Sequence, residues 1–253
     1  MGKDLAWLKE HRVAHRGLHD NKVYPENSLK AYKNAVDHGY DIEMDVWLTK
    51  SNVLIMHHDA NLKRTAGLDI KATDLDTNNL EQYKLFGTDE HVPLFDDMLK
   101  TVDGKVGLII EIKPTKRVQA TCEMVMEHLK GYKGKYCIES FDWNVVNYMH
   151  KHYPEVILGQ LYDYLWWQRI PAIIMRQYKK VNFLAICIRN GESKYYAKLR
   201  AKNKDKVFVT WTVRTPEQQA LAIKACDNYI FEADIKKEGN ISLPNPNIKD
   251  DKN

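Results

Sequence analysis

The chain has 253 residues, of which 44% are hydrophobic and 28% are charged, and this balance is that of an ordinary globular protein. A chain of this length can bury a sizeable core, so neither an intrinsically disordered protein nor a disulfide-stapled miniprotein is expected. The formal net charge is only +4 and the basic residues are scattered, which argues against a dedicated nucleic-acid-binding protein.

The cysteines and the N-terminus indicate the cellular compartment. The chain has four cysteines, none in a C-x-x-C pair or with the spacing of a zinc module: Cys122, Cys137, Cys187 and Cys226. They are expected to be reduced core residues. The segment from Met1 to Arg12 lacks the apolar region of a signal peptide, and no apolar run reaches the length of a membrane span. A cytoplasmic protein is therefore expected.

Short apolar runs alternate with segments of helical periodicity along the chain. The run at 13–15 is followed by a helical pattern from Ser28 to His38, with Gly39 as its stop. Further strands are predicted at 42–47, 53–56, 106–112, 136–140, 156–161, 184–188, 207–213 and 229–231, and further helices at 117–130, 143–152, 193–203 and 216–225. An alternation of strand and helix repeated about eight times predicts a parallel sheet.

The fold class follows from this order of elements. No glycine-rich dinucleotide turn divides the pattern into two half-sheets, so closure into a (β/α)8 TIM barrel of the α/β class is favoured. The barrel is expected to be a single domain over residues 1–236. Residues 237–253 contain two prolines and several asparagines and charges, which predicts a flexible tail.

Polar residues stand where the predicted strands end, and barrel enzymes carry their active sites there. The first strand ends in His15 and Arg16, and the second carries Glu43 and Asp45. The spacing of two residues puts both carboxylates on one face of the strand. A buried charge in such an apolar strand costs several kcal/mol, by rough estimate, unless it is paired or metal-bound.

The following strands add further polar groups. The run at 53–56 ends in His57, His58 and Asp59, and the strand at 106–112 is followed by Lys113 after Glu111. Three carboxylates suit Mg²⁺ or Ca²⁺, an arginine and a lysine suit a phosphate, and two histidines suit acid–base chemistry. Any one of these residues could instead form a structural ion pair. Taken as a set at successive strand ends, they predict metal-assisted phosphoryl transfer or phosphodiester cleavage.

These motifs also carry a family resemblance. In chain order they are His15-Arg16-Gly17, Pro25-Glu26-Asn27-Ser28, Glu43-Met44-Asp45, His58-Asp59 with Leu62-Lys63-Arg64-Thr65, Glu111-Ile112-Lys113 and Trp211-Thr212-Val213. Together they resemble the glycerophosphodiester phosphodiesterase family from about residue 13 to residue 232. The first fifty residues of the match are the most specific.

The resemblance implies a (β/α)8 barrel that hydrolyses glycerophosphodiesters to glycerol 3-phosphate and an alcohol, with Ca²⁺ or Mg²⁺ as cofactor. It implies metal ligands at Glu43, Asp45 and Glu111, catalytic residues at His15 and His58, and phosphate contacts at Arg16 and Lys113. Which histidine is the acid stays open. The nucleophile could be water or the neighbouring glycerol hydroxyl, which would give a cyclic phosphate first.

Two further residues have both a structural and a functional interpretation. Glu26 belongs to the motif Pro25-Glu26-Asn27-Ser28, in which Asn27 or Ser28 is expected to cap the first helix. Glu26 would nevertheless sit at the barrel mouth beside the metal ligands, where it would support them or bind the substrate. Trp211 is either a core aromatic residue or a wall for the substrate glycerol. A third feature is the short segment between Asp59 and Pro93, which is too short for the inserted small domain of larger family members. The pocket for the leaving group is then expected to be open.

An aromatic stretch follows the predicted strand at 156–161. It contains Tyr162, Tyr164, Trp166 and Trp167. One interpretation is an outer helix packed on the barrel, and the other is an apolar lip that contacts an acyl chain or a membrane surface. The second interpretation favours a lysophospholipase D as an alternative function. A non-catalytic phosphate-binding barrel is disfavoured, because no expected ligand or acid–base residue is missing. No oligomeric state is predicted.

Overall fold

The computed structural model describes residues 3–163, 179–233 and 240–248. The chain divides into two compact units, one of residues 14–136 and the other of residues 1–13 together with 137–253. The order of the elements, with a parallel strand after nearly every helix, is that of a (β/α)8 barrel, as the sequence predicts.

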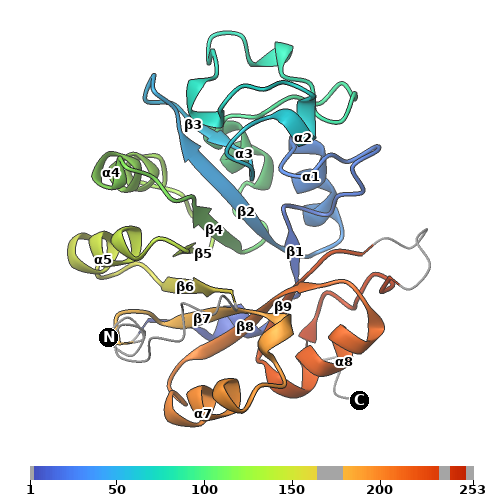
Figure 1. The fold of residues 1–253 in the computed structure, drawn as a ribbon, viewed down its shortest axis with the longest axis vertical. Helices are drawn as coiled ribbons and strands as arrows, with labels where there is room; N and C mark the ends of the chain where they lie inside the picture. Colours follow the sequence, from blue (N-terminus) through green and yellow to red (C-terminus); the bar gives the residue numbers. More distant parts are fainter. Residues whose placement is uncertain (1–2, 164–178, 234–239, 249–253) are drawn as a thin grey trace. The chain divides into compact units, whose positions relative to one another are not determined.

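The unit of residues 14–136 contains the strands β1 (Val13–His15), β2 (Asp41–Leu48), β3 (Leu54–Met56) and β4 (Leu108–Ile112), and the helices α1 (Leu29–Asp37), α2 (Lys63–Ala66), α3 (Phe95–Val102) and α4 (Val118–His128) (Figure 1). Strand β2 pairs with β1 and, in parallel, with β4. Every residue of β4 is buried, which is typical of a parallel strand that is covered on both faces.

Helix α1 starts where the sequence predicts it to start. The hydroxyl of Ser28 accepts a hydrogen bond from the backbone N–H of Ala31 at 3.1 Å and caps the helix. Helix α3 was not among the predicted elements. Its buried residues are nevertheless spaced at i, i+3, i+4 and i+7, namely Phe95, Met98, Leu99 and Val102. The periodic signal was therefore present in the sequence, over only two turns.

The predicted strand at 53–56 has a different role from the others. As β3 it pairs antiparallel with β2, with Trp47 opposite Ile55. The connection between the two strands is a short turn in which Asn52 has a φ of 63°. A parallel pairing needs a crossover of about a dozen residues, so a turn of this length can only form a hairpin.

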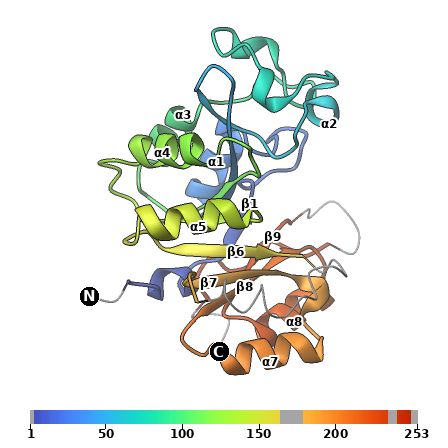
Figure 2. The same cartoon turned by 60° about the vertical axis from the view of Figure 1, so that its left-hand side comes forward.

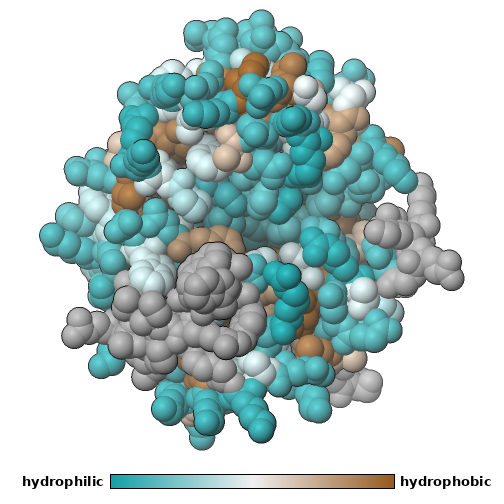
Figure 3. Space-filling view, viewed as in Figure 1, coloured by the Kyte–Doolittle hydropathy of each residue, from teal (hydrophilic) through white to brown (hydrophobic). Residues whose placement is uncertain are grey.

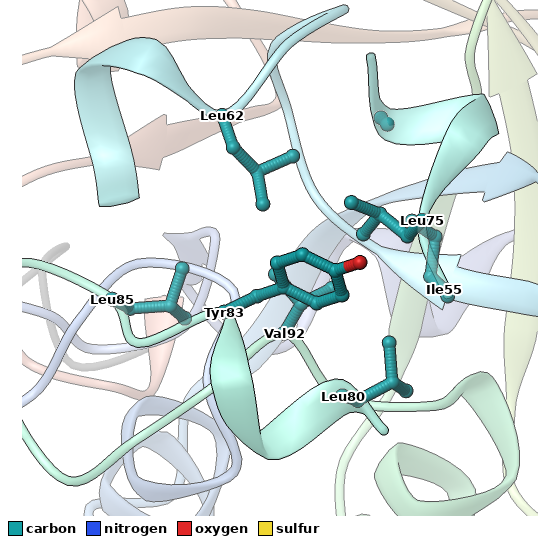
Figure 4. Packing of buried hydrophobic residues seen from close by; sticks show 8 residues of the cluster. Ile55, Leu62, Leu75, Leu80, Tyr83, Leu85 and Val92 are labelled. Carbon is teal, nitrogen blue, oxygen red and sulfur yellow. The ribbon is translucent and has the colours of Figure 1, made fainter. Parts of the chain in front are cut away.

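The segment between Asp59 and Pro93 is compact although it contains little regular structure. A cluster of buried apolar side chains holds it together over β3 (Figure 4). Its members are Ile55, Leu62, Ala72, Leu75, Leu80, Tyr83, Leu85 and Val92. Two isolated antiparallel β-bridges connect its loops, one between Asn61 and Lys71 and the other between Lys84 and His91. The segment thus has an apolar core of its own, which includes Leu62, the residue just before helix α2.

The second unit contains the parallel strands β5 (Tyr136–Ser140), β6 (Leu158–Tyr162), β7 (Phe183–Cys187), β8 (Val207–Val213) and β9 (Asn228–Phe231), with the helices α5 (Trp143–His152), α7 (Lys194–Lys202) and α8 (Pro216–Ala225) and the 3-10 turn η1 (Ala6–Lys9). Helices α7 and α8 lie on the same side of β7 and β8 (Figure 2). Thr215 and Gln218 form a capping box at the start of α8.

Part of the predicted flexible tail is packed against this unit. The backbone N–H of Arg12 donates to the carbonyl of Pro246 at 2.8 Å, and that of Ile248 donates to Glu10 at 2.9 Å. The side chain of Ile241 is 1% exposed. Residues 240–248 are thus held in place, whereas the predicted boundary at residue 236 falls outside the described residues and stays a prediction.

Two further sequence predictions concern the surface and the cysteines. Within the described ranges, no helix has the length and apolar character needed to cross a bilayer. The visible face of residues 14–136 is mainly hydrophilic (Figure 3). Among the described residues of this unit, the exposed large apolar side chains are Val23 and Leu68. All four cysteines are described, and no disulfide bond joins them.

Candidate active site

Three buried carboxylates converge in the unit of residues 14–136. Glu43, Asp45 and Glu111 each offer an oxygen atom, and these atoms lie within 4.8 Å of one another. The convergence follows from the strands, because Asp45 and Glu111 are register partners in the parallel pair β2–β4. Glu43 precedes Asp45 by two residues and shares its face. The structure therefore brings together the three acids that the sequence selected.

Lys113 neutralises part of this negative charge. Its ammonium lies 3.1 Å from Asp45 Oδ1 and 2.8 Å from Glu111 Oε1, and only 8% of the side chain is exposed. Burial alone would lower the pKa of Lys113, but the charges of Asp45 and Glu111 outweigh burial and raise it. The lysine is consequently a fixed positive charge at the edge of the cluster.

The acids respond differently to their shared environment. Burial would raise the pKa of Asp45, but the positive charges of Lys113 and Arg16 hold it well below its usual range. For Glu111, burial dominates and raises the pKa to about 7, and the nearby charge of Asp45 adds to this rise. Three oxygen ligands with surplus negative charge in a buried site fit a hard divalent cation, which would favour the ionised form of all three.

The turn after β1 presents Arg16 to the acids. The Arg16 backbone N–H donates to Glu43 Oε2 at 3.2 Å, and its Nε lies 3.5 Å from Asp45 Oδ2. His15 stands beside it, with Nε2 3.7 Å from Glu43 Oε2. Arg16 has a φ of 53° and Gly17 a φ of 80°, so the chain turns sharply at this point. The turn places a histidine and a guanidinium at the same acidic cluster.

Replacing Gly17 with alanine tests the importance of this turn for folding. A Cβ atom at position 17 would lie 2.8 Å from the carbonyl carbon and 2.9 Å from the carbonyl oxygen of Ala31, and the left-handed backbone already disfavours alanine. We expect Gly17→Ala to lower the free energy of unfolding by about 1–2 kcal/mol or more. Urea denaturation followed by circular dichroism measures the loss. A match to the wild-type midpoint would contradict this account of the turn.

Glu26 is a hub of ion pairs at the same site. Its carboxylate accepts hydrogen bonds from Arg16 Nη1 at 2.7 Å, from Arg64 Nη1 and Nη2 at 2.8 and 2.6 Å, and from Asn21 Nδ2 at 3.2 Å. Burial would raise its pKa, but the bonds from Arg64 and the charge of Arg16 lower it to about 2. Both oxygens contact arginines, so Glu26 supports Arg16, and a substrate contact for it stays a prediction.

The sequence predicts only a possible helix-capping role for Asn27, but in the structure Asn27 lies in the candidate site. Its amide Nδ2 donates to Asp45 Oδ2 at 2.8 Å, and its Oδ1 accepts from the hydroxyl of Tyr32 at 2.8 Å. The latter bond orients the amide so that its N–H₂ group faces the carboxylate. Asn27 has a φ of 54°, a conformation in which asparagine is enriched. An asparagine just before the cap was the only available signal.

The two adjacent histidines have different surroundings. His57 is 2% exposed, and its ring nitrogens bond to the Asp59 carbonyl at 2.8 Å and to Thr65 Oγ1 at 2.9 Å. His58 is partly exposed, and its Nδ1 lies 2.6 Å from Asp59 Oδ1. Burial is the main reason why the pKa of His58 is lowered. Of the two, His58 is the one that can face a substrate.

A sequence model of the glycerophosphoryl diester phosphodiesterase family matches residues 15–231. The chain belongs to this family. Among curated relatives, a glycerophosphodiester phosphodiesterase from Caldanaerobacter subterraneus is 30% identical over 60% of this chain and 66% of its own. Lysophospholipase D GDPD1 from Rattus norvegicus is 28% identical over 51% of this chain and 45% of its own. The chain spans about half the length of the first curated relatives it matches.

Solved structures support the fold of this glycerophosphoryl diester phosphodiesterase family member. A glycerophosphodiester phosphodiesterase from Thermotoga maritima is 26% identical, with a TM-score of 0.73 over 88% of this chain and 94% of its own. A phosphodiesterase from Oleispira antarctica, solved in complex with the product sn-glycerol-3-phosphate, is 20% identical, with a TM-score of 0.74 over 89% of this chain and 94% of its own.

The remaining residues predicted for this family member lie in the other unit. Trp211 is part of β8, and its Nε1–H donates to the Ala185 carbonyl at 3.0 Å. Its ring packs edge to face against the ring of Phe141, with 5.6 Å between the ring centroids. Its contact with glycerol stays a prediction. Tyr162 is buried at the end of β6. Tyr164, Trp166 and Trp167 lie outside the described residues.

Proposed function

We propose that this chain is a metal-dependent phosphodiester hydrolase that cleaves glycerophosphodiesters to glycerol 3-phosphate and an alcohol. The observation that carries the proposal is the buried cluster of three carboxylates, with Arg16 and Lys113 as its cations. Membership of the family supports the reaction class. The product bound to the Oleispira antarctica phosphodiesterase supports the substrate class.

Glu43, Asp45 and Glu111 are the residues that would hold the divalent cation, Ca²⁺ or Mg²⁺. When bound, the cation supplies Lewis-acid stabilisation of negative charge on the phosphate. Asn27 holds the carboxylate of Asp45 in one orientation, which prepares the site for a ligand of fixed geometry.

The other site residues would act on the phosphodiester directly. Arg16 and Lys113 provide positive charge that stabilises the extra negative charge of the transition state. One of His15 and His58 removes the proton of the nucleophile, and the other protonates the departing alcohol. Nδ1 of His58 is engaged by Asp59, so its Nε2 is the nitrogen that can exchange a proton with the substrate. The nucleophile is either water or the neighbouring glycerol hydroxyl.

Hydrolysis of glycerophosphocholine tests the proposal. The purified chain is incubated with the substrate and either Ca²⁺ or Mg²⁺, and phosphorus NMR follows the products. We expect glycerol 3-phosphate with at least one of the two ions, and complete loss of activity in EDTA that is reversed by adding the ion back. Phosphocholine as the product, or full activity in EDTA, would count against the proposal.

Lysophospholipase D activity is the second candidate function. It is favoured by the relatives from Rattus norvegicus and Mus musculus, which carry this name. Membrane contact through Tyr162, Tyr164, Trp166 and Trp167 belongs to this candidate, and a cytoplasmic location remains part of the proposal. Turnover of lysophosphatidylcholine relative to glycerophosphocholine separates the two functions. A preference for the lysolipid that is lost in the double variant Trp166→Ala/Trp167→Ala would support the second.

A further inference from the structure

A single arginine connects two parts of the candidate active site. Arg64, on helix α2, donates from Nε to Asp59 Oδ2 at 2.8 Å and from Nη2 to Asp59 Oδ1 at 3.2 Å. The same guanidinium donates to both oxygens of Glu26, at 2.8 and 2.6 Å. A planar guanidinium can hold two carboxylates in this way, whereas a lysine ammonium cannot.

Each of these carboxylates in turn holds a residue of the proposed machinery. Asp59 Oδ1 lies 2.6 Å from His58 Nδ1, and Glu26 Oε1 accepts a hydrogen bond from Arg16 Nη1 at 2.7 Å. A carboxylate on Nδ1 selects one tautomer and one orientation of the ring. Two side chains with different proposed tasks therefore depend on the position of one guanidinium.

The compact segment between Asp59 and Pro93 fixes Arg64 itself. Leu62, two residues before it, is fully buried in the apolar cluster of this segment (Figure 4). The backbone N–H of Phe86 donates to the carbonyl of Thr65 at 2.6 Å, and the ring of Phe86 lies 5.9 Å from the Arg64 guanidinium. The apolar cluster therefore stabilises the segment and also helps to fix the position of Arg64.

We propose that Arg64 is a positioning residue, which fixes the ring of His58 through Asp59 and the guanidinium of Arg16 through Glu26. The inference adds to the proposed function, and its relevance to catalysis rests on that proposed function. It assigns no direct substrate contact to Arg64. The segment between Asp59 and Pro93 then acts as the scaffold that sets the distance between a proton-transfer group and a phosphate-binding group.

The test uses Asp59→Asn, Arg64→Gln and Arg64→Lys, with Arg117→Gln as the matched control. Arg117 also connects two segments of the same unit, through bonds from its guanidinium to the Thr49 carbonyl and to Asn52, and both of these partners lie outside the candidate active site. Arg64 is exposed, with 43% of its side chain accessible, so both of its variants are expected to fold. The titration of the His58 imidazole is followed by NMR in the intact chain, and kcat and KM are measured with glycerophosphocholine.

The substitutions are expected to move the His58 titration in opposite directions. Asp59→Asn removes the negative partner and lowers the pKa of His58. Arg64→Gln leaves the Asp59 charge uncompensated and raises it, and Arg64→Lys raises it less. None of the variants replaces the other charged groups that act on His58, namely Asp45, Lys113 and Arg16. We expect kcat to fall about 10- to 100-fold in all three variants, and neither quantity to change in Arg117→Gln.

An unchanged His58 titration in the Arg64 variants, or a shift of the same sign in Asp59→Asn and Arg64→Gln, would overturn the inference. So would an unchanged kcat in Arg64→Gln. The titration needs no turnover. A wild-type chain that does not hydrolyse glycerophosphocholine would therefore refute the proposed function, while the NMR measurement would still decide whether Arg64 acts on His58.

Discussion

Replacing His58 with glutamine is expected to lower kcat about 10²- to 10⁴-fold, because the variant loses a group that transfers a proton in the transition state. Glutamine keeps the approximate size and polarity of the ring. His58 is partly exposed and its ring bonds to the neighbouring Asp59, so the fold should tolerate the change. Steady-state hydrolysis of glycerophosphocholine at saturating metal measures the effect. Retention of more than a tenth of wild-type kcat would remove His58 from the proposed acid–base pair.

The neighbouring histidine provides the matched control. His57→Gln breaks two buried contacts, to the Asp59 carbonyl and to Thr65, and should lower the free energy of unfolding by about 1–3 kcal/mol. The kcat of the folded variant should stay within a few-fold of wild type. Burial lowers the pKa of His57 in the folded chain. As the pH falls through about 6.5, the ordinary pKa of a histidine, the His57 imidazole is therefore protonated more readily in the unfolded chain than in the folded one.

The consequence is a pH dependence of stability with a definite sign. The wild-type chain should lose stability between pH 7 and pH 5, and His57→Gln should lose less over the same interval. Denaturant titrations at the two pH values measure the difference. If the two proteins lost the same amount of stability, His57 would not be a neutral buried histidine, and the contrast between the two ring environments would no longer hold.

The acidic cluster could be predicted because its geometry follows from periodicity. A spacing of two residues fixes the face that Glu43 and Asp45 share, and parallel strands place their carboxyl ends at one edge. The register that sets Asp45 opposite Glu111 was not predictable, because it depends on the hydrogen bonds between β2 and β4. The antiparallel direction of β3 was not predictable for a related reason, because the pattern of a short apolar run does not give the direction of a strand.

The supporting residues of the site were beyond the reach of sequence patterns. Asn27 acts from a left-handed backbone conformation, and Arg64 acts from a helix of only four residues, too short for any periodic signal. Asn27 bonds to Asp45, which is 18 residues away along the chain, and Arg64 bonds to Glu26, which is 38 residues away. Such contacts are set by how loops pack, so a motif can mark these residues without revealing what they hold.

Replacing Asp45 with asparagine is expected to lower kcat on the order of 10³-fold or more, because a bound cation contributes several kcal/mol to phosphodiester cleavage and Asp45 is central to its site. Asparagine keeps the shape of the side chain but removes the charge. It also removes a partner of the buried Lys113 ammonium, 3.1 Å from Asp45 Oδ1, and breaking a buried pair costs about 3–5 kcal/mol of stability. Folding must therefore be checked by circular dichroism alongside activity.

Metal affinity separates loss of the cation from loss of the fold. Isothermal titration calorimetry with Ca²⁺ and with Mg²⁺ should show binding to the wild type and none to folded Asp45→Asn. Glu26→Gln is the matched control, because Glu26 is a buried carboxylate of the same unit whose oxygens contact Arg16 and Arg64 rather than the cluster. It should keep its metal affinity. Unaltered binding to Asp45→Asn would mean that the acids converge for a structural reason, with the side chains of Lys113 and Arg16 as their counter-charges.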